Sequence, residues 1–125
     1  MQKIIVGILS VGSGIGQSVI ESLRLSNFNF HTIGLGNNPL AFGSYECNEM
    51  IIIPSFYDEN YINVLYNLCI DKSIQILIPG SDDEALILSK QVDIFRNINV
   101  KLIVSEPSFM MLIRDKNNLS KMFKN

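Results

Sequence analysis

Short runs of apolar residues alternate along the chain with stretches in which apolar residues recur at helical spacing. The apolar runs predict five strands, at residues 3–9, 30–35, 50–53, 75–78 and 101–104. These runs are apolar at consecutive positions, which is typical of strands that are buried on both faces. Because strands and helices alternate, the pattern predicts an α/β fold in which helices join parallel strands.

The helical spacing predicts three helices, over about 16–26, 59–72 and 82–96, and a fourth that begins near Pro107. In each of the first three helices, the apolar residues form one stripe that can pack on a sheet. The three stripes are Ile15, Val19 and Leu23; Tyr61, Leu65, Leu68 and Cys69; and Ala85, Leu88, Val92 and Phe95.

The order of the strands follows from two general rules of α/β proteins. Crossovers between parallel strands are right-handed, and doubly wound sheets reverse their winding next to the first strand. We therefore expect a Rossmann-like three-layer domain with a five-stranded parallel sheet in the order 3-2-1-4-5. In this order the first and fourth strands are neighbours at the reversal point, where ligands bind. The loops that follow these two strands are residues 10–16 and 79–84.

The first of these loops is rich in glycine, and its candidate binding residues are Gly12, Ser13, Gly14, Ile15 and Gly16. Glycines let a backbone approach a ligand closely, and the helix that follows offers free N–H groups to an anion. The alternative is that these glycines serve only the tight turn between strand and helix.

The second loop carries Ser81, Asp82, Asp83 and Glu84, whose carboxylates suit an amine, a hydroxyl or a bridging cation. A purely structural role is the alternative. Ser81 and Glu84 have the spacing of a capping box, and the start of a helix favours acidic residues without any ligand.

The glycine loop does not fit the dinucleotide fingerprint GxGxxG, because the third glycine, Gly16, comes one residue early and Gln17 follows it. The acid that binds the adenosine ribose is also absent, since the second strand ends in Gly36-Asn37. NAD is therefore the second choice of ligand. A phosphate-binding Walker loop is excluded because no Gly-Lys-Ser/Thr follows, and a receiver domain would need an aspartate where Ile53-Pro54 stands.

Composition narrows the partners further. The 125 residues include 10 Lys and Arg against 12 Asp and Glu, which gives no basic field for nucleic acid or an anionic membrane. The chain has two cysteines, Cys47 and Cys69, and one histidine, His31, which indicate neither a zinc site nor a disulfide framework. We assign no functional role to His31 or Cys47. The apolar runs are far shorter than the roughly 20 residues that cross a bilayer. We expect a cytoplasmic protein.

The whole chain resembles the N-terminal, or pre-ATP-grasp, domain of ATP-grasp ligases of the carbamoyl-phosphate-synthase-like kind. The resemblance rests on the order and spacing of several segments, which are "GSGIGQSVIESL", "GSYECNEMIIIP", "DENYINVLYNLC", "ILIPGSDDEALIL", "VKLIVSEP" and "RDKNNLSKMF". Relatives often carry an aspartate after the second strand, where this chain has Gly36-Asn37.

The resemblance implies that residues 1–114 form the pre-ATP-grasp domain and that residues 115–125 begin a truncated ATP-grasp domain. It also implies ATP-dependent ligation in a longer parent, in which a carboxylate or bicarbonate is phosphorylated and an amine then attacks. ATP and Mg would bind in later domains of the same chain, and Lys116 would contact ATP phosphate only in that complete enzyme. Gly12 to Gly16 would cradle an anionic group of a small-molecule acceptor substrate, and Ser81 to Glu84 would form the opposite wall.

For the fragment alone we therefore expect no catalysis and no cofactor. Two alternatives stay open: a stand-alone Rossmann-like regulatory domain that binds a nucleotide or metabolite, and a scaffold without a ligand.

Overall fold

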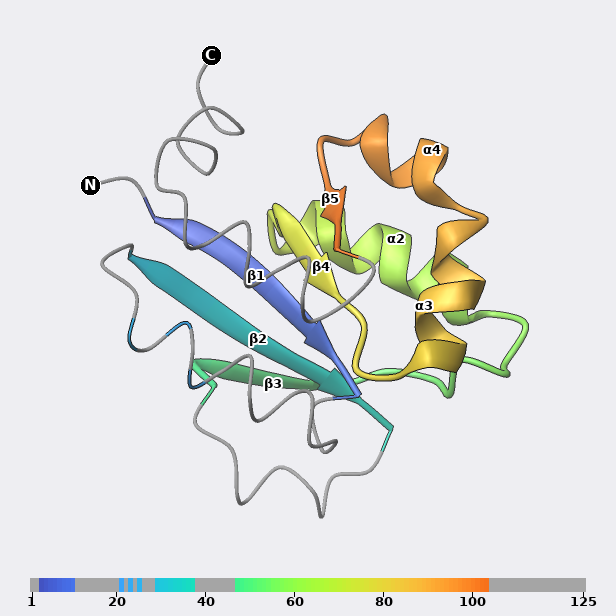
Figure 1. Ribbon diagram of the computed structural model, residues 1–125, viewed down its shortest axis with the longest axis horizontal. Helices are drawn as coiled ribbons and strands as arrows, with labels where there is room; N and C mark the ends of the chain where they lie inside the picture. Colours follow the sequence, from blue (N-terminus) through green and yellow to red (C-terminus); the bar gives the residue numbers. More distant parts are fainter. Residues whose placement is uncertain are drawn as a thin grey trace.

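A five-stranded parallel sheet forms the centre of the structure (Figure 1). The structure is a computed structural model, in which residues 3–10, 21, 23, 25, 29–37 and 47–103 are described. Each strand overlaps one of the predicted apolar runs, with ends that differ by up to two residues. The strands are β1 (Ile4–Leu9), β2 (Phe30–Gly36), β3 (Glu49–Ile52), β4 (Ile76–Ile78) and β5 (Lys101–Leu102).

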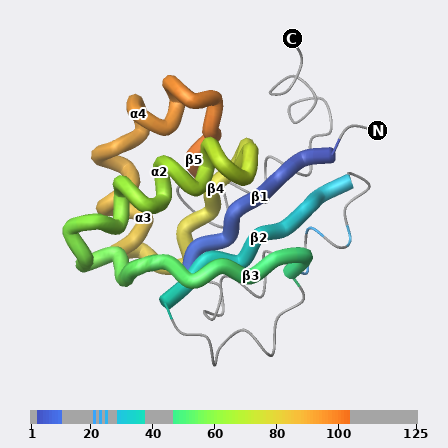
Figure 2. The backbone as a smooth tube through the Cα atoms, turned by 180° about the vertical axis from the view of Figure 1, so that it is seen from behind, coloured from blue at the N-terminus to red at the C-terminus, as the bar shows by residue number. Residues whose placement is uncertain are grey.

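The sheet has the order β3-β2-β1-β4-β5, and every neighbouring pair is parallel. Figure 2 shows the same arrangement from behind. β1 pairs with β4 through the partners Val6 and Ile76, and it pairs with β2 on its other edge. The predicted α/β fold, strand order and winding are therefore confirmed.

Both faces of the sheet are buried at its central strands. Side chains of successive strand residues point to opposite faces, and in β1 the consecutive residues Ile8 and Leu9 are both 0% exposed. In β4 the same holds for Ile76 and Leu77. This two-sided burial explains why the strands lack an alternating polar pattern.

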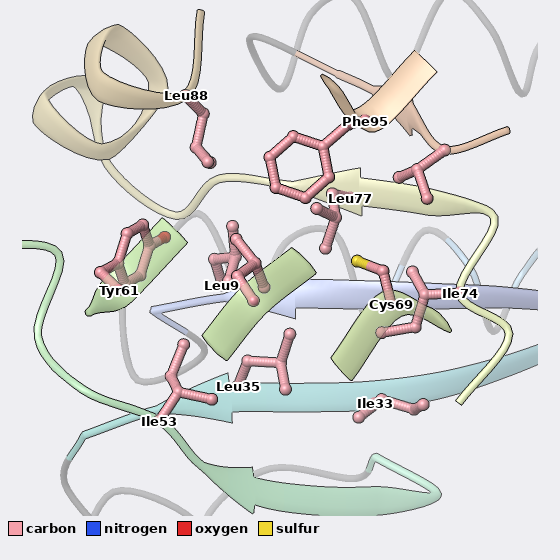
Figure 3. Close-up of a cluster of buried hydrophobic side chains, with 12 residues drawn as sticks. Leu9, Ile33, Leu35, Ile53, Tyr61, Cys69, Ile74, Leu77, Leu88 and Phe95 are labelled. Atoms are coloured by element: carbon pink, nitrogen blue, oxygen red, sulfur yellow. The ribbon is translucent and has the colours of Figure 1, made fainter. Parts of the chain in front are cut away.

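Three helices, α2 (Tyr61–Asp71), α3 (Asp82–Ser89) and α4 (Val92–Arg96), contribute to the core on one face of the sheet. One buried cluster joins residues of all three helices to the strands (Figure 3). Burial also raises the pKa of the Cys69 thiol to about 12, so Cys69 is an unreactive core residue. The helical members of the cluster are Tyr61, Leu65, Cys69, Leu88 and Phe95.

The prediction of a single helix over residues 82–96 is wrong, because the structure has two helices there. α3 ends at Ser89, whose hydroxyl donates to the Leu86 carbonyl over 2.7 Å and competes with the helical hydrogen bonds. The chain then passes through Gln91, which has a non-helical ψ of 16°. Leu88 and Phe95 are nevertheless both 0% exposed, so the break preserves the predicted apolar stripe.

Residues 21, 23 and 25 are helical, in agreement with the predicted first helix. Leu23 is buried and Leu25 is exposed, as the predicted stripe requires. Ile15, Val19 and the helix predicted from Pro107 lie outside the described residues. Over the part of the chain that the structure describes, no helix has the length and hydropathy to span a bilayer.

Candidate functional site

Ser10, the residue that directly follows β1, lies against the segment that follows β4 at the carboxyl edge of the sheet. Gly80 is so close to the end of β1 that a Cβ atom placed on it would collide with the Leu9 carbonyl oxygen and with Ser10. Only glycine permits this approach without a shift of one backbone or the other. The strand order predicted that the loops after these two strands meet, and Ser10, the described residue of the first loop, does contact the second loop at Gly80 and Glu84.

The side chain of Glu84 connects these two segments. Its Oε1 accepts hydrogen bonds from the Ser10 hydroxyl at 2.8 Å and from the Gly80 amide at 3.3 Å. Its Oε2 accepts a 2.7 Å bond from the Tyr61 hydroxyl. Glu84 is 2% exposed, so this carboxylate is buried and is held by groups from the end of β1, the β4–α3 segment and α2. Such bonds to a carboxylate are among the stronger ones in proteins.

Tyr61 begins α2 and is 1% exposed (Figure 3). Burial, followed by the negative charge of Glu84, raises the pKa of the Tyr61 phenol far above its ordinary value. The hydroxyl therefore keeps its proton and acts as a donor to Glu84. Helical spacing identified Tyr61 only as a core residue, and no sequence signal pointed to its hydroxyl.

Ser10 is the first residue after β1 and has an unusual backbone conformation. Its φ is 48°, in the left-handed region that residues with a Cβ rarely adopt. The hydrogen bond to Glu84 helps to hold Ser10 in this conformation. Strain of this kind is concentrated at binding and catalytic sites. Ser10 was not among the predicted site residues, although it opens the predicted loop.

The other predicted residues of the second loop have different environments. Ser81 is the N-cap of α3, and its Oγ accepts from the Glu84 amide at 3.2 Å. Only this half of the capping box is present, because the Glu84 carboxylate is bound to Ser10, Gly80 and Tyr61 instead. Asp82 and Asp83 are exposed in the first turn of α3. The Tyr57 hydroxyl lies 3.5 Å from Asp83, at the limit of a hydrogen bond.

A small cavity lies beside this carboxylate network, at the carboxyl ends of β1, β2 and β3. Its volume is about 40 Å³. The polar residues in its wall are Ser10, Asn37, Ser55 and Glu84, and the remainder of the wall comes from the end of β2 and the segment after β3. No sequence pattern predicted this cavity, because its wall comes from four separate parts of the chain.

The glycine loop cannot be compared with this geometry. Gly12, Ser13, Gly14, Ile15 and Gly16 lie outside the described residues, as does Lys116. Their predicted roles stay predictions, and so does the boundary between residues 114 and 115.

Among the described residues, no group of three or more His, Cys, Asp and Glu side chains could hold a metal ion. His31 hydrogen-bonds to Glu49 over 2.7 Å, and Lys72 binds the other oxygen of Glu49 at 2.9 Å. This ion-pair cluster joins β2, β3 and the end of α2, apart from the Glu84 network. Cys47 is partly buried, and burial raises the pKa of its thiol.

Comparison with known proteins gives one family and several structures of the same fold. A family model described as the PylC-like N-terminal domain matches residues 6–103. No curated protein matches the chain. A structure of glycinamide-RNase-transformylase T from Mycobacterium tuberculosis is similar with a TM-score of 0.58 and 11% identity, over 94% of this chain and 33% of that one.

Two further structures are also similar, each at 15% identity. A short-chain dehydrogenase/reductase from Veillonella parvula has a TM-score of 0.53, over 81% of this chain and 46% of that one. A Rossmann-fold NAD(P)-binding family protein from Shigella flexneri has a TM-score of 0.54, over 79% of this chain and 49% of that one. The chain thus spans half or less of the length of these three structures. At such identities the likeness supports the Rossmann-like fold and does not extend to ligands.

Proposed function

The chain belongs to the family of PylC-like N-terminal domains, and we propose that it is the substrate-binding N-terminal domain of an ATP-dependent carboxylate-amine ligase of the carbamoyl-phosphate-synthase-like ATP-grasp kind. In this proposal the fragment contributes the acceptor-substrate site and is not catalytic by itself. ATP and Mg bind in later domains of the parent, which supply the phosphate-binding and metal-binding side chains.

The contact of Leu9 and Ser10, at the end of β1, with the segment after β4 is the observation that carries the proposal. Gly80 packs on the end of β1, and Glu84 binds Ser10, so the start of the glycine loop lies beside the first turn of α3. The exposed carboxylates of Asp82 and Asp83 are at this same edge. Ligands of open α/β sheets bind where the winding reverses, between β1 and β4 in this order.

Gly12 to Gly16 would then hold an anionic group of the acceptor substrate through backbone N–H groups, and Ser81 to Glu84 would form the opposite wall. Lys116 would contact ATP phosphate in the complete enzyme. Glu84 has a supporting part in this arrangement, because its carboxylate fixes Ser10 and Gly80.

Steady-state kinetics of the complete ligase test whether the loops bind the acceptor substrate and Lys116 binds ATP. Gly14→Val should raise the Michaelis constant for the acceptor substrate and change that for ATP little, because the added side chain blocks approach to the backbone. Asp83→Asn should weaken acceptor binding by removal of charge. Lys116→Ala should have the reverse effect: it should raise the Michaelis constant for ATP and change that for the acceptor substrate little. Loss of ATP binding in a folded Gly14→Val variant would make the loop a nucleotide site and overturn the proposal.

The alternative is a stand-alone Rossmann-like regulatory domain that binds a nucleotide or metabolite. The end of β2 argues against a dinucleotide, since Gly36 and Asn37 stand where an acid would bind the ribose. The coding sequence after Asn125 separates the alternatives. The ligase proposal requires that it continue into ATP-grasp domains, whereas a regulatory domain requires none.

A further inference from the structure

The small cavity beside Glu84 has a wall of uneven chemical character. Its volume of about 40 Å³ is enough for about three water-sized groups. Ser10, Asn37, Ser55 and Glu84 supply polar atoms to the wall, and Ile53 and Phe56 supply apolar ones. The cavity lies at the carboxyl edge of the sheet, where α/β proteins bind ligands.

Glu84 brings a buried negative charge to this cavity without a positive partner among the described residues. Its three hydrogen-bond donors, on Ser10, Gly80 and Tyr61, are all neutral. Between described residues, the ion pairs are His31–Glu49, Lys72–Glu49 and Arg96–Asp93, and none includes Glu84. The hydrogen bonds and the N-terminus of α3 reduce the cost of burying this charge. A buried carboxylate is normally also paired with a cation.

The hydrogen-bonding groups that Glu84, Ser10 and Ser55 offer to the cavity are mainly acceptors. A carboxylate offers about four acceptor positions, and the structure occupies three of them on Glu84. The hydroxyl proton of Ser10 is directed to Glu84, so its oxygen is left to accept. The Ser55 hydroxyl oxygen already accepts from the Tyr57 amide at 3.3 Å and has a second lone pair. This part of the wall therefore calls for a donor and a positive charge.

We propose that this cavity binds the primary ammonium group of a small molecule, with the Glu84 carboxylate as its counter-ion and the Ser10 and Ser55 hydroxyl oxygens as further acceptors. An ammonium group has three donors and no acceptor, and it is small enough for the cavity with one attached carbon. The inference rests on the proposed function only in taking this group to be part of the acceptor substrate. A free monovalent metal ion shares the positive charge and the preference for oxygen, so the test includes one.

Thermal unfolding of the 125-residue chain at constant ionic strength provides the test, with methylammonium chloride, potassium chloride and tetramethylammonium chloride as probes. Methylammonium should raise the midpoint in a saturable way. When the methylammonium concentration is about ten times its dissociation constant, the folding equilibrium constant should increase about tenfold. Tetramethylammonium has no N–H donor and is too large, so it should have no such effect. Equal stabilisation by all three salts, by potassium alone or by none would overturn the proposal.

Three variants locate the effect. Glu84→Gln keeps the shape of the side chain and removes its charge, so the methylammonium shift should disappear. Glu59→Gln is the matched control, because it makes the same change at an exposed position before α2 and should keep the shift. Ser55→Val narrows the cavity and removes an acceptor without touching the Glu84 hydrogen bonds, so it remains informative if Glu84→Gln does not fold. A wild-type shift in folded Glu84→Gln or in Ser55→Val would place the binding elsewhere and overturn the proposal.

These results are independent of the ligase proposal. The probes are simple ammonium salts and the readout is stability, so a negative result leaves the kinetic tests of Gly14 and Lys116 unaffected. Conversely, a chain that proves to be a regulatory domain could still show the methylammonium shift.

Discussion

The Tyr61 hydroxyl donates a 2.7 Å hydrogen bond to Oε2 of Glu84, which ties the first residue of α2 to the first turn of α3. Both residues are almost completely buried. The bond connects the helix that follows β3 to the segment that follows β4. It therefore fixes the Glu84 carboxylate, and with it the first turn of α3, against the start of α2.

Replacement of Tyr61 by Phe tests how much this bond contributes. The ring can keep its packing, but Glu84 loses a donor in a buried place, so the free energy of unfolding should fall by about 1–3 kcal/mol. Tyr66→Phe is the matched control, because the Tyr66 ring is only partly buried against Phe95, and its effect should stay within about 0.5 kcal/mol. Urea unfolding measures both. Similar small losses in the two variants would mean that the bond is not important for stability.

Gly80→Ala should disturb the contact between the segments after β1 and β4. The new Cβ would meet the backbone of Leu9, which cannot rotate away, and the expected loss is about 1–3 kcal/mol or more. Gly7→Ala is a useful comparison, since its Cβ would lie 2.9 Å from a methyl group at the end of the Leu77 side chain, which can move. Denaturant unfolding should rank Gly80→Ala as the more damaging change. The opposite order would contradict the close backbone approach.

Two replacements of Ser10 separate its hydrogen bond from its backbone strain. Ser10→Ala and Ser10→Gly both remove the bond to Glu84, but only glycine is relaxed at a φ of 48°. We expect Ser10→Gly to be more stable than Ser10→Ala by about 1–2 kcal/mol. Thermal unfolding gives the difference directly. If the two variants are equally stable, Ser10 is not strained in the folded chain.

The ion-pair cluster of Glu49 predicts a pH dependence at low pH. The hydrogen bond from His31, and then Lys72, lowers the pKa of Glu49 from its ordinary value. A carboxyl group whose pKa is lower in the folded state stabilises the protein above the unfolded pKa of about 4.3, and this contribution disappears as pH falls through the folded value.

Comparison of wild type with Glu49→Gln tests this expectation. The wild type should be the more stable protein at about pH 5, and the difference should shrink toward about pH 2. It should also shrink at high salt, because the side chains of Lys72 and Glu49 are partly exposed to solvent. Glu59→Gln, an exposed change outside the cluster, supplies the baseline. A difference that is constant over this range would show that Glu49 does not act through its charge.

The strands and their order could be predicted because consecutive apolar residues are unusual outside two-sided parallel sheets, and because crossover handedness leaves few topologies. The break between α3 and α4 could not, since the spacing of Leu88 and Phe95 suits one helix or two. Whether one helix or two helices form depends on the Ser89 hydroxyl, which competes with backbone N–H groups for the Leu86 carbonyl. The apolar pattern contains no information on this competition.

The partners of Glu84 could not be predicted from the sequence either. Ser81 and Glu84 have capping-box spacing, yet the carboxylate binds Ser10, 74 residues away, and Tyr61, 23 residues away. Spacing along the chain predicts which local hydrogen bonds can form. It does not show whether a side chain will instead hydrogen-bond to residues far away in the sequence. The cavity next to Glu84 was missed for the same reason.

Isothermal calorimetry of the chain with NADH is the measurement that tests the central claim most directly, because it distinguishes a ligase substrate domain from a dinucleotide sensor. We predict heats equal to those of dilution for NADH, because β2 ends in Gly36 and not in an acid. ATP with Mg²⁺ should likewise give no binding and no hydrolysis with this chain. A low-micromolar dissociation constant for NADH would contradict the ligase assignment and favour a regulatory Rossmann-like domain.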